Sequence, residues 1–257
     1  MMHVEIHGDG RRPYLLLVHG LCSSRGQWRP NLAALAKVAT PVVVELLGHG
    51  RSQSPADPAA YRVEAYIERF EALRTQLGAE RWAICGQSFG AGLTLNYALA
   101  HPGRISAQVV TNSASGLGPA RPVVSEEVRR ERAAAFVARG RAGLEAKAIY
   151  PKRSGRLPPD VEDELVRDVE LISLEAMAQT ITVTAPGLSA ADRLGEIAVP
   201  TLLVNGRREK SFQPLRDLAA ARIPGVRVVD LEGGHPVNLD CAAEFDAAAT
   251  AFLAATA

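Results

Sequence analysis

The chain carries almost no net charge and contains no long apolar run, and both absences exclude classes of protein. Its 257 residues include 29 lysines and arginines against 28 aspartates and glutamates, which gives a formal net charge of +1. Such a balance provides no general attraction to nucleic acid or to an anionic membrane. No apolar run approaches the roughly 20 residues that a bilayer span needs. We therefore expect a small-molecule partner, and neither nucleic-acid nor membrane binding.

Cysteine is scarce as well. Cys22, Cys85 and Cys241 are odd in number and lack metal-ligand spacing, so neither a disulfide framework nor a metal site is expected. Free thiols favour a reducing compartment. The first residues also lack the basic stretch followed by an apolar stretch that marks a secretory signal. The sequence predicts a cytoplasmic protein without a cofactor. It does not decide whether the protein is a monomer or a homodimer.

Short β-rich runs alternate with longer amphipathic stretches from Pro13 to Leu117, which is typical of βαβ units. The first two predicted strands are nearly all apolar, as expected for strands covered by helices on both faces. The sequence therefore predicts an α/β fold with a mostly parallel sheet flanked by helices. The expected strands are 14–18, 41–46, 82–85, 105–111, 201–204 and 227–231, and the expected helices include 29–37, 63–77, 89–100 and 241–254.

The pattern changes after Pro119. Residues from about 122 to 184 show helical periodicity and hold most of the charge runs, with no strand pattern. Strand-like sequence resumes at Thr201. We interpret residues 118–190 as an all-helical lid inserted into a single core domain of residues 1–117 and 191–257. Such an insertion would lie over the strand ends, where α/β folds bind ligands.

The most informative motif is Gly86-Gln87-Ser88-Phe89-Gly90, which stands between an apolar run and a helical stretch. A serine on such a strand-to-helix turn is held in a strained conformation, and glycines on both sides leave room for neighbouring backbone. The motif predicts a nucleophile elbow, with Ser88 exposed to substrate at the end of the strand.

A serine nucleophile needs a general base and an acid that orients the base. Among the six histidines, His235 follows the predicted strand 227–231 and the flexible Gly233-Gly234, so it lies at a strand's carboxyl end. Glu209 follows the predicted strand 201–204 and gives the chain order serine, acid, histidine. Asp192, Asp217 and Glu232 are weaker candidates for the acid. Among the other histidines, His101 suits a helix cap, His49 a turn, and His3 and His7 an edge hairpin.

The developing oxyanion needs two N–H donors. The sequence predicts the backbone N–H groups of Leu21, after the first long strand, and of Phe89, in the elbow. His19 is expected to support the loop that carries Leu21 through hydrogen bonds, rather than to act as an acid or base. Substrate contacts are expected from Gln87, Trp28 and Met177.

With these motifs the chain resembles an α/β-hydrolase, specifically a small serine hydrolase with a lid. The resemblance implies catalysis by Ser88, His235 and Glu209 without a cofactor. In the broader family the acid is usually aspartate, whereas this chain has glutamate. The resemblance covers nearly the whole chain and is carried by the elbow together with His19-Gly20, Gly48-His49-Gly50-Arg51-Ser52, His101-Pro102, Gly206 with an acid three residues on, and Gly234-His235.

Three functions follow as hypotheses. The first is hydrolysis of a carboxylic ester or related acyl compound. The second is carbon–carbon cleavage or elimination on a carboxylate-bearing substrate, as in the relatives that cleave meta-ring-fission products or act in menaquinone synthesis; an arginine within reach of Ser88 would favour it. The third is a non-catalytic ligand receptor on the same fold. The arginines in question are Arg121, Arg129, Arg130, Arg132, Arg139 and Arg141.

Overall fold

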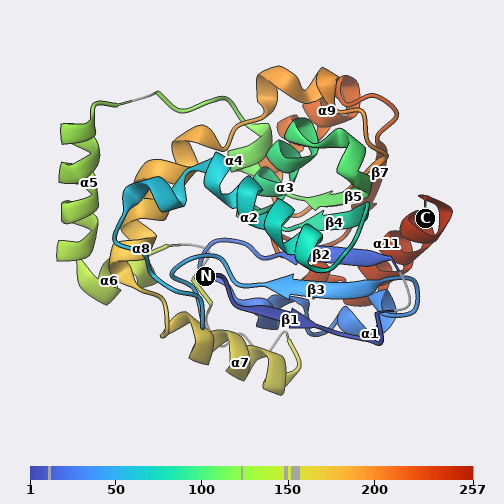
Figure 1. Cartoon of the computed structure of the whole chain (residues 1–257), viewed down its shortest axis with the longest axis horizontal. Coiled ribbons are helices and arrows are strands. Elements are labelled where there is room, and N and C mark those ends of the chain that lie inside the picture. Colours follow the sequence, from blue (N-terminus) through green and yellow to red (C-terminus); the bar gives the residue numbers. More distant parts are fainter. Residues whose placement is uncertain (11–12, 123, 148–149, 152–156, 257) are drawn as a thin grey trace.

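The computed structural model describes residues 1–10, 13–122, 124–147, 150–151 and 157–256. Within these residues a 7-stranded sheet runs in the order β1-β3-β2-β4-β5-β6-β7 (Figure 1). Only β1 is antiparallel to its neighbour among the described strands; every other pair is parallel. The strands are β1 (Val4–Ile6), β2 (Tyr14–Val18), β3 (Thr40–Val44), β4 (Trp82–Gly86), β5 (Ile105–Thr111), β6 (Thr201–Gly206) and β7 (Arg227–Leu231).

The structure confirms the predicted fold class, and all six predicted strands are present. Three of them, β2, β5 and β7, have the predicted bounds. The expected edge hairpin near His3 and His7 is wrong, because β1 pairs with β3 and not with the next strand in the chain. A strand as short as Val4–Ile6 carries too little periodicity to reveal its partner.

Helices cover both faces of the sheet, which explains the uninterrupted apolar strands. In β2, Leu16 and Val18 enter one hydrophobic cluster while Leu15 and Leu17 enter another, because successive side chains point to opposite faces. The first cluster lies against α2 (Val63–Gln76), α3 (Phe89–Ala100) and α9 (Gln213–Arg222). The second lies against α1 (Leu32–Leu35), α10 (Val237–Asp240) and α11 (Ala242–Thr256).

Residues 118–190, which we call the inserted segment, follow β5 and the short helix α4 (Ala114–Leu117). The helices α5–α8 lie together beside one end of the sheet (Figure 1). Contacts with the loops after β2 and β3 identify this as the carboxyl end of the strands; Ser173 N–H donates to Gly48 O at 3.0 Å. The helices are α5 (Glu126–Ala138), α6 (Gly140–Glu145), α7 (Pro159–Val169) and α8 (Leu174–Gln179), followed by a π-helical turn at Thr180–Thr184.

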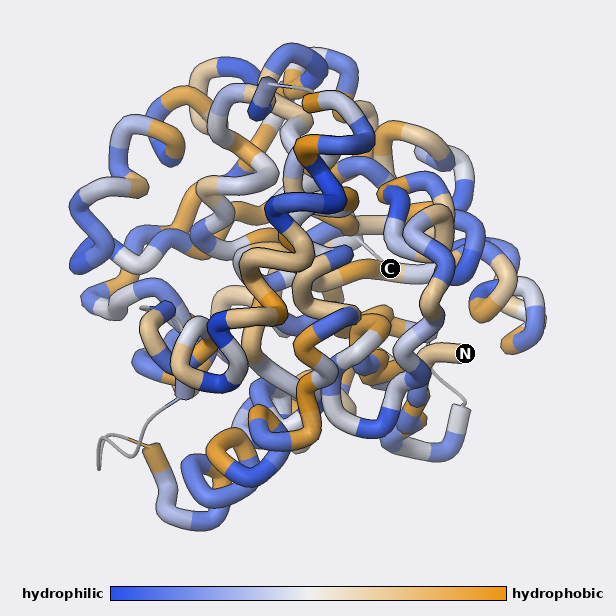
Figure 2. The backbone as a smooth tube through the Cα atoms, turned by 90° about the vertical axis from the view of Figure 1, so that its left-hand side faces the viewer, coloured by the Kyte–Doolittle hydropathy of each residue, from blue (hydrophilic) through white to orange (hydrophobic). Residues whose placement is uncertain are grey.

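The inserted segment has a small apolar centre of its own. Cys22 of the core, Leu144, Val169, Ile172 and Met177 form a buried cluster, which we call the insertion cluster. Figure 2, in which this side faces the viewer, shows hydrophilic and hydrophobic residues interleaved along these helices. Within the described ranges, no helix combines the length and the apolar character required to cross a membrane. The division at residues 118 and 190 stays a prediction.

Candidate active site

The backbone at Ser88 has the conformation that the elbow motif predicts. Ser88 lies between β4 and α3 with φ 53° and ψ −113°, a region that side-chain-bearing residues rarely adopt. A Cβ atom at Gly90 would collide with the carbonyl oxygens of Val18 and His19, and one at Gly86 would collide with the backbone of α3. Both glycines are therefore required where the turn approaches its neighbours.

Hydrogen bonds connect the three residues predicted to carry the chemistry. His235 Nε2 lies 2.8 Å from Ser88 Oγ, and His235 Nδ1 lies 2.9 Å from Glu209 Oε2. Because an ionised carboxylate only accepts, Nδ1 carries the ring proton and donates to Glu209. Nε2 is then free to accept the proton of the Ser88 hydroxyl. The three side chains come from the carboxyl ends of β4, β6 and β7.

Asn112, immediately after β5, holds the carboxylate of Glu209 in place. Its Nδ2 donates to Glu209 Oε2 at 2.7 Å, and its Oδ1 accepts from Gly206 N–H at 2.8 Å. Burial opposes ionisation of Glu209, but the hydrogen bonds from His235 and Asn112 and the charge of His235 together lower its pKa below the ordinary value. The sequence analysis does not identify Asn112, although a polar residue at a strand's carboxyl end is a usable signal.

Three further contacts fix the loops that carry Ser88 and His235. Gln87 Nε2 donates to the carbonyl of His235 at 3.2 Å, and Gly234 N–H donates to Asp240 Oδ2 at 2.7 Å. The Ser113 hydroxyl donates to the carbonyl of Ser88 at 2.6 Å. Ser113 and Asp240 were not identified from the sequence, because their contacts join segments that periodicity does not relate.

Leu21 and Phe89 present backbone N–H groups with no acceptor among the described residues. Beneath Leu21, His19 Nε2 accepts from Leu46 N–H at 3.0 Å, so Nδ1 carries the proton and donates to Gly20 O at 2.7 Å. Burial, with a smaller effect of His49, lowers the pKa of His19 to about 3. His19 is therefore neutral and supports the loop, as its position in the sequence suggests.

The chain matches the model of the alpha/beta hydrolase fold family over residues 13–241. The chain belongs to this family. A Bacillus subtilis protein provisionally named 2-succinyl-6-hydroxy-2,4-cyclohexadiene-1-carboxylate synthase is 24% identical over 246 residues, which is 92% of this chain and 89% of the relative. The Bacillus subtilis carboxylesterase YbfK is 24% identical over 241 residues, which is 93% of this chain and 79% of the relative.

Among solved structures, the enol-lactonase from Burkholderia xenovorans LB400 superimposes with a TM-score of 0.77 at 26% identity, covering 98% of this chain and 96% of that one. Together these matches identify the protein as an α/β-hydrolase enzyme.

A cavity of about 350 Å³ opens beside Ser88 and His235 in this hydrolase. The loop of Leu21, the loop of His235 and α7 of the inserted segment all contribute to its wall. Among the described residues, the wall contains two carboxylates, Glu162 and Asp240, and no lysine or arginine. Residues 152–156 lie outside the described part of the chain. The other lining residues are Leu21, Cys22, Ser23, Gln27, Gln87, Tyr150, Pro151, Leu157, Leu165, Val166, Pro236 and Leu239.

Of the three residues expected to contact substrate, only Gln87 lines this cavity. Trp28 is fully buried and packs against Phe245 of α11, with ring centroids 6.3 Å apart. Met177 is buried in the insertion cluster. The expectation for these two is not met, because the Trp28 indole packs in the hydrophobic cluster against α11 and Met177 packs in the insertion cluster.

Cys22 lines the cavity near Ser88 but is unsuited to be the nucleophile. Burial raises the pKa of its thiol to about 12, with only a small opposing effect from Lys147. The thiol therefore stays protonated near neutral pH, where a thiolate would be needed for attack.

A buried amide network joins the loop of Leu21 to the segment after His235. Gly20 N–H donates to Gln27 Oε1 at 3.0 Å, and Asn238 Nδ2 donates to Gln27 O and to Asn31 Oδ1, both at 3.1 Å. The sequence analysis misses these amides, since nothing in their spacing relates residue 27 to residue 238. The network holds the loop of Leu21 and the loop of His235 at a fixed separation.

Proposed function

We propose that this hydrolase cleaves a carboxylic ester or a related acyl compound through Ser88, without a cofactor. The observation that carries the proposal is the continuous hydrogen-bonded path from Ser88 Oγ through both ring nitrogens of His235 to Glu209. Such a path lets the hydroxyl lose its proton while the imidazole is held in one tautomer.

In the proposed reaction, Ser88 Oγ attacks the carbonyl carbon as its proton passes to His235 Nε2. The resulting imidazolium lies beside the carboxylate of Glu209, which stabilises its charge. The leaving alcohol then takes the proton from Nε2, and an acyl-enzyme on Ser88 remains. Water attacks this ester with His235 again as base, which releases the acid and restores the serine.

The negative charge that develops on the carbonyl oxygen needs donors that exist before the reaction. The N–H groups of Leu21 and Phe89 suit this role, because neither has an acceptor among the described residues. The Phe89 N–H also lies at the first turn of α3, where the helix dipole favours negative charge.

The wall of the Ser88 cavity favours a neutral acyl group. The charged side chains in its described lining, besides the proposed base, are those of Glu162 and Asp240, so no described lysine or arginine would bind a carboxylate on the substrate. The similarity to a carboxylesterase and an enol-lactonase supports hydrolysis of an ester or a related acyl compound.

Hydrolysis of short p-nitrophenyl esters tests the proposal. We expect turnover by the wild-type chain and a loss of at least about 10³-fold in Ser88→Ala, with Ser54→Ala, an exposed serine, as the matched control. A fluorophosphonate should label Ser88 in the folded protein. Equal rates from the wild type and Ser88→Ala would refute the serine mechanism, and a folded protein that is not labelled would favour a ligand receptor.

Carbon–carbon cleavage or elimination on a carboxylate-bearing substrate is the second candidate, supported by the full-length similarity to the Bacillus subtilis synthase. The described lining of the Ser88 cavity provides no cation for such a substrate. Comparison of p-nitrophenyl butyrate with the mono-p-nitrophenyl ester of succinate separates the two candidates. We expect the neutral ester to have the higher kcat/KM; a preference of ten-fold or more for the succinate ester would favour the second candidate.

A further inference from the structure

A second cavity, of about 520 Å³, lies in the inserted segment and is bordered by basic side chains. It is enclosed by the loop before α5, by one side of α5 and by the π-helical turn after α8. We call it the basic cavity. Five cations line it: Arg121, Arg129, Arg132, Arg139 and Lys147.

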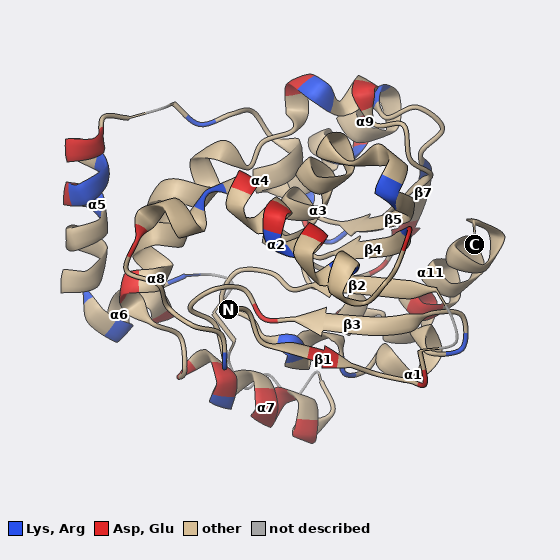
Figure 3. Ribbon diagram, viewed as in Figure 1, with Lys and Arg blue, Asp and Glu red and all other residues tan. Residues whose placement is uncertain are grey.

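The charges around the basic cavity are not balanced. Its described lining contains no acidic residue, although the chain as a whole has a net charge of only +1. Arg129 lies 3.7 Å from Glu126 and donates to Gln179, whereas Arg121, Arg132 and Arg139 have no acidic partner among the described residues. Figure 3 shows basic residues along α5 beyond its acidic first turn. Arg121, Arg132 and Arg139 are exposed, so water screens part of their mutual repulsion, and an anion bound between them would reduce it further.

The basic cavity also has an apolar wall. Phe136 of α5 and Ile181 of the π-helical turn line it, and Val124, Pro122 and Pro186 border it. The Lys147 ammonium lies 5.4 Å from the centroid of the Phe136 ring. Apolar surface beside several cations suits an organic anion better than a bare inorganic one.

The basic cavity is separate from the cavity at Ser88. The two share no described lining residue. Between them lies the insertion cluster, against which Leu21 and Tyr150 pack from the Ser88 cavity and Phe136 and Ile181 pack from the basic cavity. One apolar cluster therefore contacts the walls of both.

We propose that the basic cavity is a second ligand site, which binds an organic anion that has two or more negative charges and an aromatic or acyl part. Guanidinium groups from the loop before α5 and from α5 hold the charges, and Phe136 and Ile181 cover the apolar part. The anion connects α5 to the rest of the inserted segment. This connection matters because α5 contributes no fully buried side chain to the packing.

Isothermal titration calorimetry of the whole chain with 2-naphthyl phosphate tests the site, because this probe carries a dianionic group on an aromatic ring. We expect a dissociation constant below about 1 mM, which should increase several-fold as the salt concentration rises. The neutral 2-naphthol and inorganic phosphate should each bind at least ten-fold more weakly. Absence of binding by 2-naphthyl phosphate, or equal binding by 2-naphthol, would overturn the proposal.

Variants decide which cavity takes the probe. The double variant Arg121→Gln/Arg132→Gln should weaken binding at least ten-fold, whereas Arg130→Gln, on the same helix but outside the lining, should leave it unchanged. Leu239→Trp narrows the Ser88 cavity and should also leave binding unchanged. Circular dichroism melting checks that each variant is folded. The opposite result, binding abolished by Leu239→Trp and retained by the double variant, would assign the anion to the Ser88 cavity and refute the proposal.

Discussion

At the scale of single residues, Ser88 and its partners depend on backbone geometry as much as on side-chain chemistry. The positive φ at Ser88 directs the hydroxyl toward His235. The flanking glycines let the turn lie close to its neighbours, Gly86 against α3 and Gly90 against the end of β2. The elbow was predictable because its whole requirement lies within five consecutive residues. Asn112 was not predictable in the same way, since its contact with Glu209 joins residues 97 positions apart.

Replacement of Glu209 tests its proposed role as the acid. In Glu209→Gln the amide no longer provides a charge beside the imidazolium, and it can favour the wrong tautomer of His235. We expect kcat for an ester to fall about 10³- to 10⁴-fold, with little change in the melting temperature. Steady-state kinetics and thermal unfolding measure both quantities. A kcat within about three-fold of the wild type would assign the acid to another residue.

Asn112 is a positioning residue in this scheme, because it contacts Glu209 and not the substrate. We expect Asn112→Ala to lower kcat about ten-fold and to leave KM nearly unchanged, since the carboxylate loses one of its two side-chain donors. Gln108→Ala, a buried amide on the same strand that bonds to Thr201, is the matched control and should affect stability alone. A rise in KM with constant kcat would instead indicate a direct role in substrate binding.

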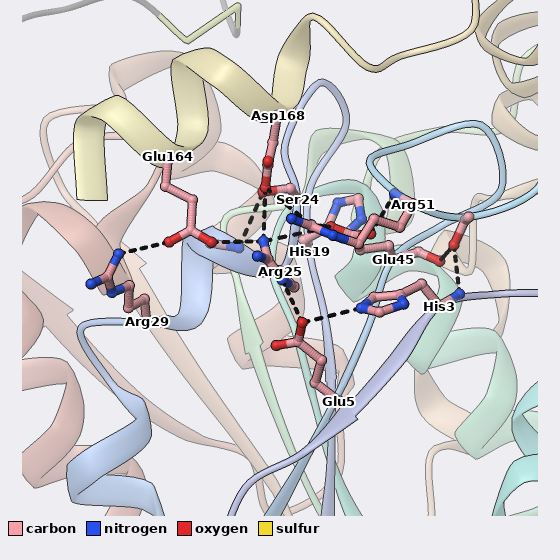
Figure 4. A network of polar contacts seen from close by, with 12 residues as sticks. His3, Glu5, His19, Ser24, Arg25, Arg29, Glu45, Arg51, Glu164 and Asp168 are labelled. Atoms are coloured by element: carbon pink, nitrogen blue, oxygen red, sulfur yellow. Dashed lines mark hydrogen bonds and ion pairs between the residues drawn. The ribbon is translucent and has the colours of Figure 1, made fainter. Parts of the chain in front are cut away.

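At the scale of elements, a network of charges attaches α7 to the core (Figure 4). Arg25, in the turn after the loop of Leu21, lies 2.6 Å from Glu5 of β1, 2.6 Å from Glu164 and 2.9 Å from Asp168 of α7. Asp168 is 3% exposed, so water screens these pairs only weakly. These ion pairs fix α7, which lines the Ser88 cavity, to β1 and to the turn that carries Arg25.

Removal of the central cation should therefore destabilise the protein. Arg25→Gln leaves Asp168 and Glu164 without their closest partner, and we expect a loss of about 2–4 kcal/mol in the free energy of unfolding by urea. Arg29→Gln is the control, because its side chain is 47% exposed, and it should cost at most about 1 kcal/mol. Equal losses in the two variants would show that the network contributes no more than a surface ion pair.

The sequence indicates the helices of the inserted segment but not how they attach to the core. Helical periodicity and charge runs predict helices within residues 122–184, and α5 to α8 lie there. The ion pairs of Arg25 span 143 positions to Asp168, and no local pattern specifies a partner at that distance. Trp28 shows the same limit. It is near Leu21 in the chain, but its side chain packs against Phe245 of α11 and does not line the Ser88 cavity.

At the scale of the whole molecule, Asp246 connects pH to the packing of α11 on the core. Asn31 Nδ2 donates to its Oδ1 at 2.8 Å, yet burial raises its pKa to about 6. The unfolded value is about 3.9, so this carboxyl favours the folded state most below pH 4. Its contribution is lost as the pH rises from about 4 through 6, because the folded protein resists ionisation there.

Substitution of Asp246 by an uncharged residue should remove this loss of stability at higher pH. Asp246→Asn keeps an acceptor for Asn31 without a charge, and we expect it to stabilise the fold by about 1 kcal/mol at pH 7, allowing for partial exposure, and by much less at pH 4. Urea unfolding at the two pH values gives the difference. Asp192→Asn, at an exposed position, should show no such dependence. A gain for Asp246→Asn that is the same at both pH values would contradict the assignment.

The α/β architecture, the elbow at Ser88 and the chain order of the proposed nucleophile, acid and base were all predictable from the amino-acid sequence. These features are local: alternating apolar runs require a sheet covered on both faces, and a glycine-flanked serine requires a sharp turn. Three outcomes required the folded chain: which side chains surround Ser88, the burial of Trp28 and Met177 away from the cavity, and the five cations of the inserted segment that line a separate cavity. Those outcomes depend on the packing of distant segments against one another, and periodicity along the chain does not record such contacts.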